Sequence, residues 1–160
     1  MTLSPTTREA IQQLVAIYPE RRTALLPALK LAQTDAGWLP PDAIAEAADL
    51  VGVPHSAAVE LAEFYTMLHT RPTARTLVVV CAQLPCALRG AEGLIRDLQV
   101  GLKTAIDEGR VEVERTSECF GACHRAPMAR VDDDYRENLD PEATRRLLSE
   151  LRSVNGRYAA

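Results

Sequence analysis

The hydrophobic pattern of residues 1–70 is that of successive amphipathic helices. A first apolar stripe follows the i, i+3, i+4, i+7 spacing that puts side chains on one face of a helix. Proline and glycine then divide the rest of this part into three further segments. The first stripe consists of Ile11, Leu14, Val15 and Tyr18. We expect four helices, from Thr7 to about residue 18 and over residues 22–34, 42–50 and 56–68.

The pattern changes after residue 75, where short strands alternate with helices. Residues 76–81 (TLVVVC) form a continuous β-branched run, which is typical of a strand buried on both faces. The alternating sequence of residues 110–115 indicates a second strand. The remaining expected elements are a helix over 90–101, a short strand over 128–131, a turn at 132–134, a return strand starting at Tyr135 and Arg136, and a closing helix over 141–152.

These elements predict an α+β protein with two domains. Residues 1–70 form an expected N-terminal helical bundle. We interpret Phe64, Tyr65 and Met67 as core residues packed between helix and sheet, with an electron-path or interface motif as the alternative. Residues 71–160 form an expected second domain with the order β-α-β-β-α, which is compatible with a small thioredoxin-like sheet. Residues 69–75 (HTRPTAR) are the expected linker.

Composition and charge argue against two classes of protein. The chain has 160 residues and a net charge of −4, whereas a protein that binds duplex nucleic acid needs a basic face for the phosphates. No apolar stretch approaches the roughly 20 residues that span a bilayer, and the N-terminal residues lack the apolar segment of a secretory signal. We therefore expect a cytoplasmic protein that binds no nucleic acid and does not insert into a membrane.

Four cysteines carry the candidate chemistry. Cys81 and Cys86 enclose four residues, Cys119 and Cys123 enclose three, and each pair follows an expected strand in a predicted loop. In a reducing cytoplasm such thiols are metal ligands or redox groups before they are disulfides. A [2Fe–2S] cluster needs four thiolates, two for each iron. The first pair is then expected on one iron and the second pair on the other.

Two other interpretations stay open at this point. A structural zinc site also takes four thiolates, although its ligand pairs usually enclose two residues. A thiol–disulfide enzyme uses a C-x-x-C motif, which this sequence lacks. The small residues Ala82, Gly121 and Ala122 let the backbone approach the sulfides of a cluster. The spacing favours iron–sulfur, with a structural four-cysteine zinc module for protein binding as the alternative of another class.

Further motifs on both sides of the cysteines match one known family. They are LLP at 25–27, GWLP at 37–40, FYTM at 64–67, LRGAE at 88–92, ECFGAC at 118–123 and APM at 126–128. With these motifs the chain resembles, over residues 8–152, the E subunit of NADH-quinone oxidoreductase, the thioredoxin-like [2Fe–2S] ferredoxin of respiratory complex I. The gamma subunit of NAD-dependent formate dehydrogenase and the matching subunit of NAD-linked hydrogenases are related to it.

The resemblance implies a fold, a cofactor and partners. The fold is a helical bundle followed by a thioredoxin-like [2Fe–2S] ferredoxin domain, and Cys81, Cys86, Cys119 and Cys123 match the family's ligands of one cluster. The implied protein is a non-catalytic electron-carrying subunit of an NADH dehydrogenase. It takes single electrons from the flavin of an NADH-oxidising partner and docks beside other iron–sulfur subunits. In a bacterium it belongs to the peripheral arm on the cytoplasmic side of the inner membrane. A formate dehydrogenase or a hydrogenase is the alternative host.

The polar residues near the cysteines are interpreted as solvated residues rather than as parts of a functional site. We interpret His124 and Arg125 as solvated loop residues rather than as groups that tune a reduction potential. The three acids of residues 132–134 are expected to form a solvated turn. The sequence does not determine the isomer of the Ala126–Pro127 bond, for which the analogy with thioredoxin-like folds favours cis.

Overall fold

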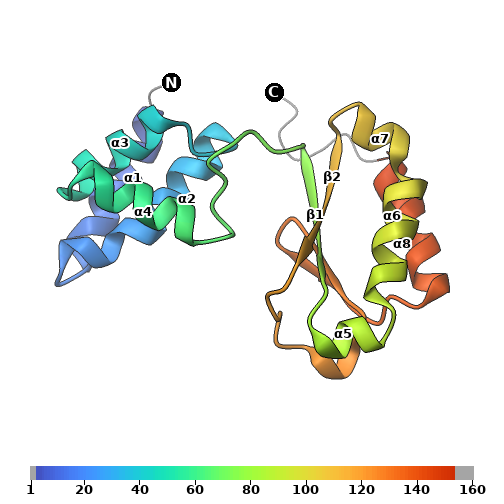
Figure 1. Cartoon of the computed structure of the whole chain (residues 1–160). Coiled ribbons are helices and arrows are strands. Elements are labelled where there is room, and N and C mark those ends of the chain that lie inside the picture. The colour runs from blue at the N-terminus through green and yellow to red at the C-terminus, as the bar shows by residue number, and fades with distance from the viewer. Residues whose placement is uncertain (1–2, 154–160) are drawn as a thin grey trace. The chain divides into compact units, whose positions relative to one another are not determined.

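The computed structural model describes residues 3–153 and divides the chain into two compact units, residues 1–73 and residues 74–160 (Figure 1). Each unit has its own hydrophobic core, and each is described by itself. That the chain consists of two domains with a boundary after residue 70 stays a prediction. Over residues 3–153, the structure contains no helix with the length and apolar character needed to cross a membrane.

The N-terminal unit has the four expected α-helices, with different ends. Its elements are α1 (Pro5–Ile17), the 3₁₀ turn η1 (Arg21–Ala24), α2 (Leu25–Ala36), α3 (Pro41–Val51) and α4 (His55–Phe64). Helix α1 begins before Thr7 because Ser4 is its N-cap, with Ser4 Oγ accepting the Thr7 N–H at 3.2 Å. Helix α4 ends at Phe64, earlier than expected, because Tyr65 already has an extended backbone.

Two expectations for this unit need correction. The single helix expected over residues 22–34 is divided into η1 and α2, and Pro27 falls in the first turn of α2, where a helix loses no internal hydrogen bond. Phe64 is not a core residue, since 76% of its surface is exposed. Its ring meets the ring of Tyr65 edge-on at 5.2 Å, whereas Tyr65 and Met67 pack against the core formed by the helices of this unit.

The core of the N-terminal unit lies between its helices and is braced by two polar side chains. Arg21 Nε donates to the Val51 carbonyl at 2.8 Å, which satisfies an otherwise free acceptor at the end of α3. The Gln33 amide fixes the chain after α4, donating to the Met67 carbonyl at 3.0 Å and accepting the His69 N–H at 2.6 Å. The large apolar residues of this core include Ile11, Leu25, Leu29, Leu39, Ile44 and Val51.

The C-terminal unit is a four-stranded sheet with α6 and α8 packed side by side against it (Figure 1). The strand order is β2-β1-β3-β4, in which β1 and β2 are parallel and the other neighbours antiparallel. This confirms the expected β-α-β-β-α order, to which the structure adds the short helices α5 and α7. The elements are β1 (Thr76–Cys81), α5 (Leu84–Leu88), α6 (Ala91–Gly101), α7 (Lys103–Asp107), β2 (Val111–Thr116), the 3₁₀ turn η2 (Cys123–Arg125), β3 (Ala129–Val131), β4 (Asp134–Arg136) and α8 (Pro141–Ser153).

Alternation along β1 gives the sheet two different faces. Val78 and Val80 are fully buried in one core with Leu98 of α6. Leu77 and Val79 point to the opposite face, because successive side chains of a strand alternate, and they are not members of that core. The helices therefore cover the face that carries Val78 and Val80.

The turn between β3 and β4 is more structured than a solvated turn. Asp132 has a φ of 51°, a region that aspartate tolerates better than most residues. Its Oδ1 accepts the Leu77 N–H at 2.9 Å, and its own N–H donates to the Leu77 carbonyl at 2.8 Å. The expectation of a merely solvated acidic turn is therefore wrong for Asp132, which ties the turn to the beginning of β1.

We expect Leu98→Ala to lower the free energy of unfolding by about 2–5 kcal/mol, because it leaves a cavity in the core of the C-terminal unit. Val100→Ala on the same helix is the matched control, since Val100 is 78% exposed, and a change of less than about 0.5 kcal/mol is expected. Urea unfolding followed by circular dichroism measures both. Equal effects of the two substitutions would contradict the assignment of α6's buried face.

Candidate metal centre

The parallel pairing of β1 and β2 brings both cysteine pairs to one end of the sheet. Cys81, the last residue of β1, lies opposite Thr116, the last residue of β2. The chain leaves β1 into α5 and leaves β2 into residues 117–123, so both connections start from the same edge. Figure 1 shows α5 and the orange segment that follows β2 together at this end.

The first pair, Cys81 and Cys86, is buried, with exposed fractions of 1% and 2%. Cys86 is not in a loop as predicted but in α5, which begins where the Gln83 side chain accepts the Leu84 N–H at 3.2 Å. Burial, followed by the hydrogen bond and the charge of Cys81, raises the pKa of the Cys86 thiol to about 11. Both thiols of the first pair are therefore shielded from solvent, and they influence each other's protonation.

The second pair, Cys119 and Cys123, is exposed, and its two Sγ atoms are 3.5 Å apart. Gly121 between them has a φ of 79°, a conformation that favours glycine, and its N–H donates to Cys119 Sγ at 3.4 Å. This backbone hydrogen bond lowers the pKa of Cys119, while the hydrogen bond with Cys119 raises the pKa of Cys123. The segment thus directs one backbone N–H group at the sulfur of Cys119.

The two pairs also act on each other. After burial and Cys81, the charge of Cys123 contributes to the raised pKa of Cys86. After Cys119 and burial, the charge of Cys81 contributes to the raised pKa of Cys123. Cys123 therefore lies near enough to Cys81 and Cys86 for their charges to interact, and Cys119 is 3.5 Å from Cys123. Across residues 3–153, no three His, Cys, Asp or Glu side chains are arranged around a single metal ion. Two facing pairs of thiols fit the donor set of a cluster with two irons.

The residues after the last cysteine connect the site to the end of β4. His124 and Arg125 are exposed, and Arg125 forms an ion pair with Glu137, whose hydrogen bond and charge raise the pKa of Arg125. The Arg125 carbonyl accepts the Asn138 N–H at 2.8 Å. The Ala126–Pro127 bond that follows is cis.

One group at the site was not foreseen from the sequence. Phe120, which lies between the two exposed cysteines, contacts Tyr135 of β4 and Arg130 of β3. These contacts depend on the register of the β3–β4 hairpin, in which Arg130 and Tyr135 are direct partners. Strand register is the only signal from which sequence analysis could have found them.

With four thiols at one end of a β-α-β-β-α sheet, the C-terminal unit has the architecture of a small iron–sulfur electron carrier. The model of the thioredoxin-like [2Fe–2S] ferredoxin family matches residues 11–152, which include all four cysteines. The chain belongs to this family, and its cofactor is a [2Fe–2S] cluster. Family membership thus decides between the iron–sulfur and zinc interpretations that the cysteine spacing left open.

Several bacterial proteins similar to this chain are named as E subunits of NADH-quinone oxidoreductase. The E 2 subunit of NADH-quinone oxidoreductase in Rhizobium meliloti (strain 1021) is 39% identical over 154 residues, covering 93% of this chain and 90% of the relative. The E subunit in Rickettsia bellii (strain RML369-C) is 36% identical and covers 89% of both chains. The E subunit in Mycobacterium tuberculosis (strain ATCC 25618 / H37Rv) is 36% identical over 89% of this chain, which spans 58% of that longer relative. The expected resemblance is confirmed over both units.

Solved structures of an NAD⁺-reducing [NiFe]-hydrogenase are also similar. The H2-reduced state gives a TM-score of 0.67 at 25% identity, and the match covers 79% of this chain and 22% of the hydrogenase chain. The air-oxidised state gives a TM-score of 0.65 at 24% identity, a likeness of fold. This chain therefore corresponds to about a fifth of a larger hydrogenase polypeptide.

We expect Cys119 to react with iodoacetamide faster than Cys86 in cluster-free protein. The pKa of Cys119 is lowered by the Gly121 N–H, whereas the pKa of buried Cys86 is raised to about 11. The reactive thiolate of Cys119 therefore forms at lower pH, while Cys86 stays protonated up to strongly alkaline pH. Mass spectrometry of time courses between about pH 6 and pH 9 measures both rates, with a free cysteine peptide as reference. Equal rates for the two residues would contradict the described environments.

Proposed function

We propose that this chain is the electron-transfer subunit of an NADH-quinone oxidoreductase, corresponding to the E subunit of that complex. Relatives of that name are 33–39% identical over 89–93% of the chain, which supports the assignment. The observation that carries it is the convergence of four thiols at one sheet edge, within the part of the chain that matches the ferredoxin family.

In this proposal Cys81 and Cys86 bind one iron, and Cys119 and Cys123 bind the other. The cluster, when bound, supplies one-electron redox chemistry. The chain holds the first pair in a buried environment on a strand and a helix, and the second pair in an exposed loop. The Gly121 N–H donates to Cys119 Sγ, and hydrogen bonds of this kind help to set a reduction potential.

The proposed partner is a flavin-bearing subunit that oxidises NADH. The sequence contains no G-x-G-x-x-G dinucleotide fingerprint, and electron transfer through a cluster needs no acid, base or nucleophile from this chain. NADH oxidation is thus assigned to the partner, and this chain takes single electrons from its flavin. We place the assembly, with its other iron–sulfur subunits, on the cytoplasmic side of a bacterial inner membrane.

A second candidate host is an NAD⁺-reducing hydrogenase. The structural similarity to such an enzyme, with a TM-score of 0.67, supports this alternative host. The relatives with high coverage of both chains have the respiratory name, which favours NADH-quinone oxidoreductase. An NAD-dependent formate dehydrogenase is a third host of the same class, in which the subunit carries electrons in the same way.

We expect Cys81→Ala and Cys119→Ala each to abolish the visible absorbance of the oxidised cluster, because each removes one of the four thiolates. Iron content should fall from about two atoms per chain to near zero. Ser117→Ala, an exposed change in the segment that carries Cys119, is the control and should keep both signals. A full cluster spectrum in either cysteine variant would refute the ligand assignment, and a colourless wild-type protein with one zinc would support the zinc alternative.

We expect NADH to reduce the cluster only in the assembled complex, because the flavin that accepts the hydride belongs to the partner. Bleaching of the visible bands is measured with NADH for the isolated chain and for the complex purified from its native host, with dithionite as the positive control for both. Reduction of the isolated chain by NADH would contradict the division of roles. Reduction of the complex by H2 would identify the hydrogenase as host.

A further inference from the structure

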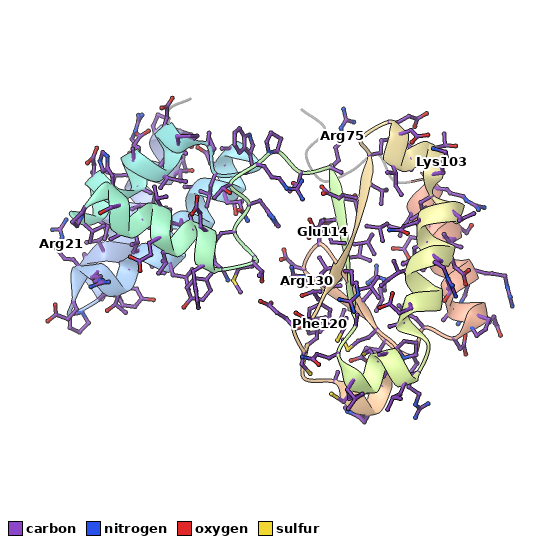
Figure 2. The ribbon with its side chains drawn as sticks, in the orientation of Figure 1. Arg21, Arg75, Lys103, Glu114, Phe120 and Arg130 are labelled. Atoms are coloured by element: carbon purple, nitrogen blue, oxygen red, sulfur yellow. The ribbon has the colours of Figure 1, made fainter. Side chains whose placement is uncertain are left out.

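An aromatic and cationic stack includes Phe120, the first of the three residues between the two exposed cysteines. The ring of Phe120 lies 5.7 Å from the ring of Tyr135, with an angle of 30° between their planes. The guanidinium of Arg130 lies over Phe120, with its Cζ 5.9 Å from the ring centroid (Figure 2). This distance is within the range of a cation–π interaction. The stack therefore joins the segment Cys119–Cys123 to strands β3 and β4.

The register of the sheet places the guanidinium of Arg130 on the face opposite the helices. Arg130 pairs directly with Tyr135 across the β3–β4 hairpin. Its neighbours in β3, Ala129 and Val131, belong to the core under α6 and α8. Because side chains alternate along a strand, Arg130 points to the opposite face of the sheet.

Arg130 has an unsatisfied polar atom. Its Nε is buried and has no hydrogen-bond partner within the part of the chain that the structure describes. A buried N–H without a partner destabilises the fold, so its presence calls for a compensating interaction. A cluster built from thiolates and sulfides is negatively charged, and the ligands Cys119 and Cys123 flank the ring on which Arg130 lies.

We propose that Arg130 is a positioning residue that holds the Cys119–Cys123 segment through Phe120 and places a fixed positive charge beside the cluster. This rests on the proposed function, because it assumes a cluster on these thiols. A bound cluster gains one negative charge when it accepts an electron, so a nearby cation favours the reduced form. Arg130 thereby influences both the position of the Cys119–Cys123 segment and the reduction potential of the cluster.

A redox titration of the holoprotein, followed by visible absorbance and by the electron paramagnetic resonance of the reduced cluster, tests the charge. Arg130→Met keeps an apolar stem and removes the cation. We expect the ratio of reduced to oxidised cluster at a fixed potential to fall about tenfold, a midpoint shift of about 59 mV to more negative values for one electron. Arg130→Lys keeps the charge and should stay within about threefold of the wild type.

Lys103→Gln is the matched control for the charge, since it removes one cation from α7, toward the other end of the sheet (Figure 2). It should leave the potential unchanged. Equal potentials for the wild type and Arg130→Met, or a tenfold change in Arg130→Lys, would overturn the proposal.

A second measurement tests the positioning and does not depend on changing Arg130. Phe120→Leu removes the ring that links Arg130 to the ligand segment, and we expect loss of the cluster to an iron chelator to become about fivefold faster. Phe64→Leu, at an exposed ring in the N-terminal unit, is the control and should not change that rate. An unchanged rate in Phe120→Leu would overturn the positioning role. A wild-type protein without iron would overturn the proposed function as well, whereas a normal wild-type cluster with unresponsive variants would overturn only the role of Arg130.

Discussion

The parallel, in-register pairing of β1 with β2 is the constraint on which the site depends. It aligns Cys81 with Thr116 and so starts both cysteine-bearing connections at one edge of the sheet. A shift of two residues would keep the faces of β2 unchanged but move its exit by about 6.6 Å along the strand, away from the end of β1. Val111 and Val113 of β2 pack against the core under α6 and α8, so an odd shift of β2 would turn both side chains to the other face of the sheet.

The two cysteine pairs lie in different environments, one buried and one exposed. Cys81 and Cys86 are carried by a strand and a helix and are buried, so their positions are set by the core. Cys119 lies in an exposed loop and Cys123 begins η2, and this segment contacts the rest of the unit through Phe120 and through the ion pair of Arg125 with Glu137. Metal binding requires deprotonated thiols, so binding to the buried pair must also overcome the raised pKa of Cys86.

Sequence analysis predicted the parts of the fold that local pattern determines. The β-branched run of β1 and the apolar stripe of α6 have strong periodicity, and the four cysteines have informative spacing. Helix α5 was missed because five residues are too few to show a helical period, and its start depends on the Gln83 cap. Phe64 was misplaced because hydrophobicity alone does not determine burial.

The hydrophobic pattern of the sequence does not predict contacts between segments that are far apart in the chain. The hydrogen bond of Asp132 with Leu77 joins residues 55 positions apart, and a run of three acids gives no sign of it. Likewise, the stack of Arg130, Phe120 and Tyr135 follows from hairpin register rather than from any property of the individual residues. Such features become visible only once the strands are paired.

The 3.5 Å separation of the Cys119 and Cys123 sulfurs has a consequence for maturation. A newly made chain presents these thiols to solvent before iron arrives, and their proximity suits them to the two-electron oxidation that joins sulfurs covalently. Because a disulfide would occupy both sulfurs, an oxidised chain could not offer these two thiolates to iron until the bond was reduced.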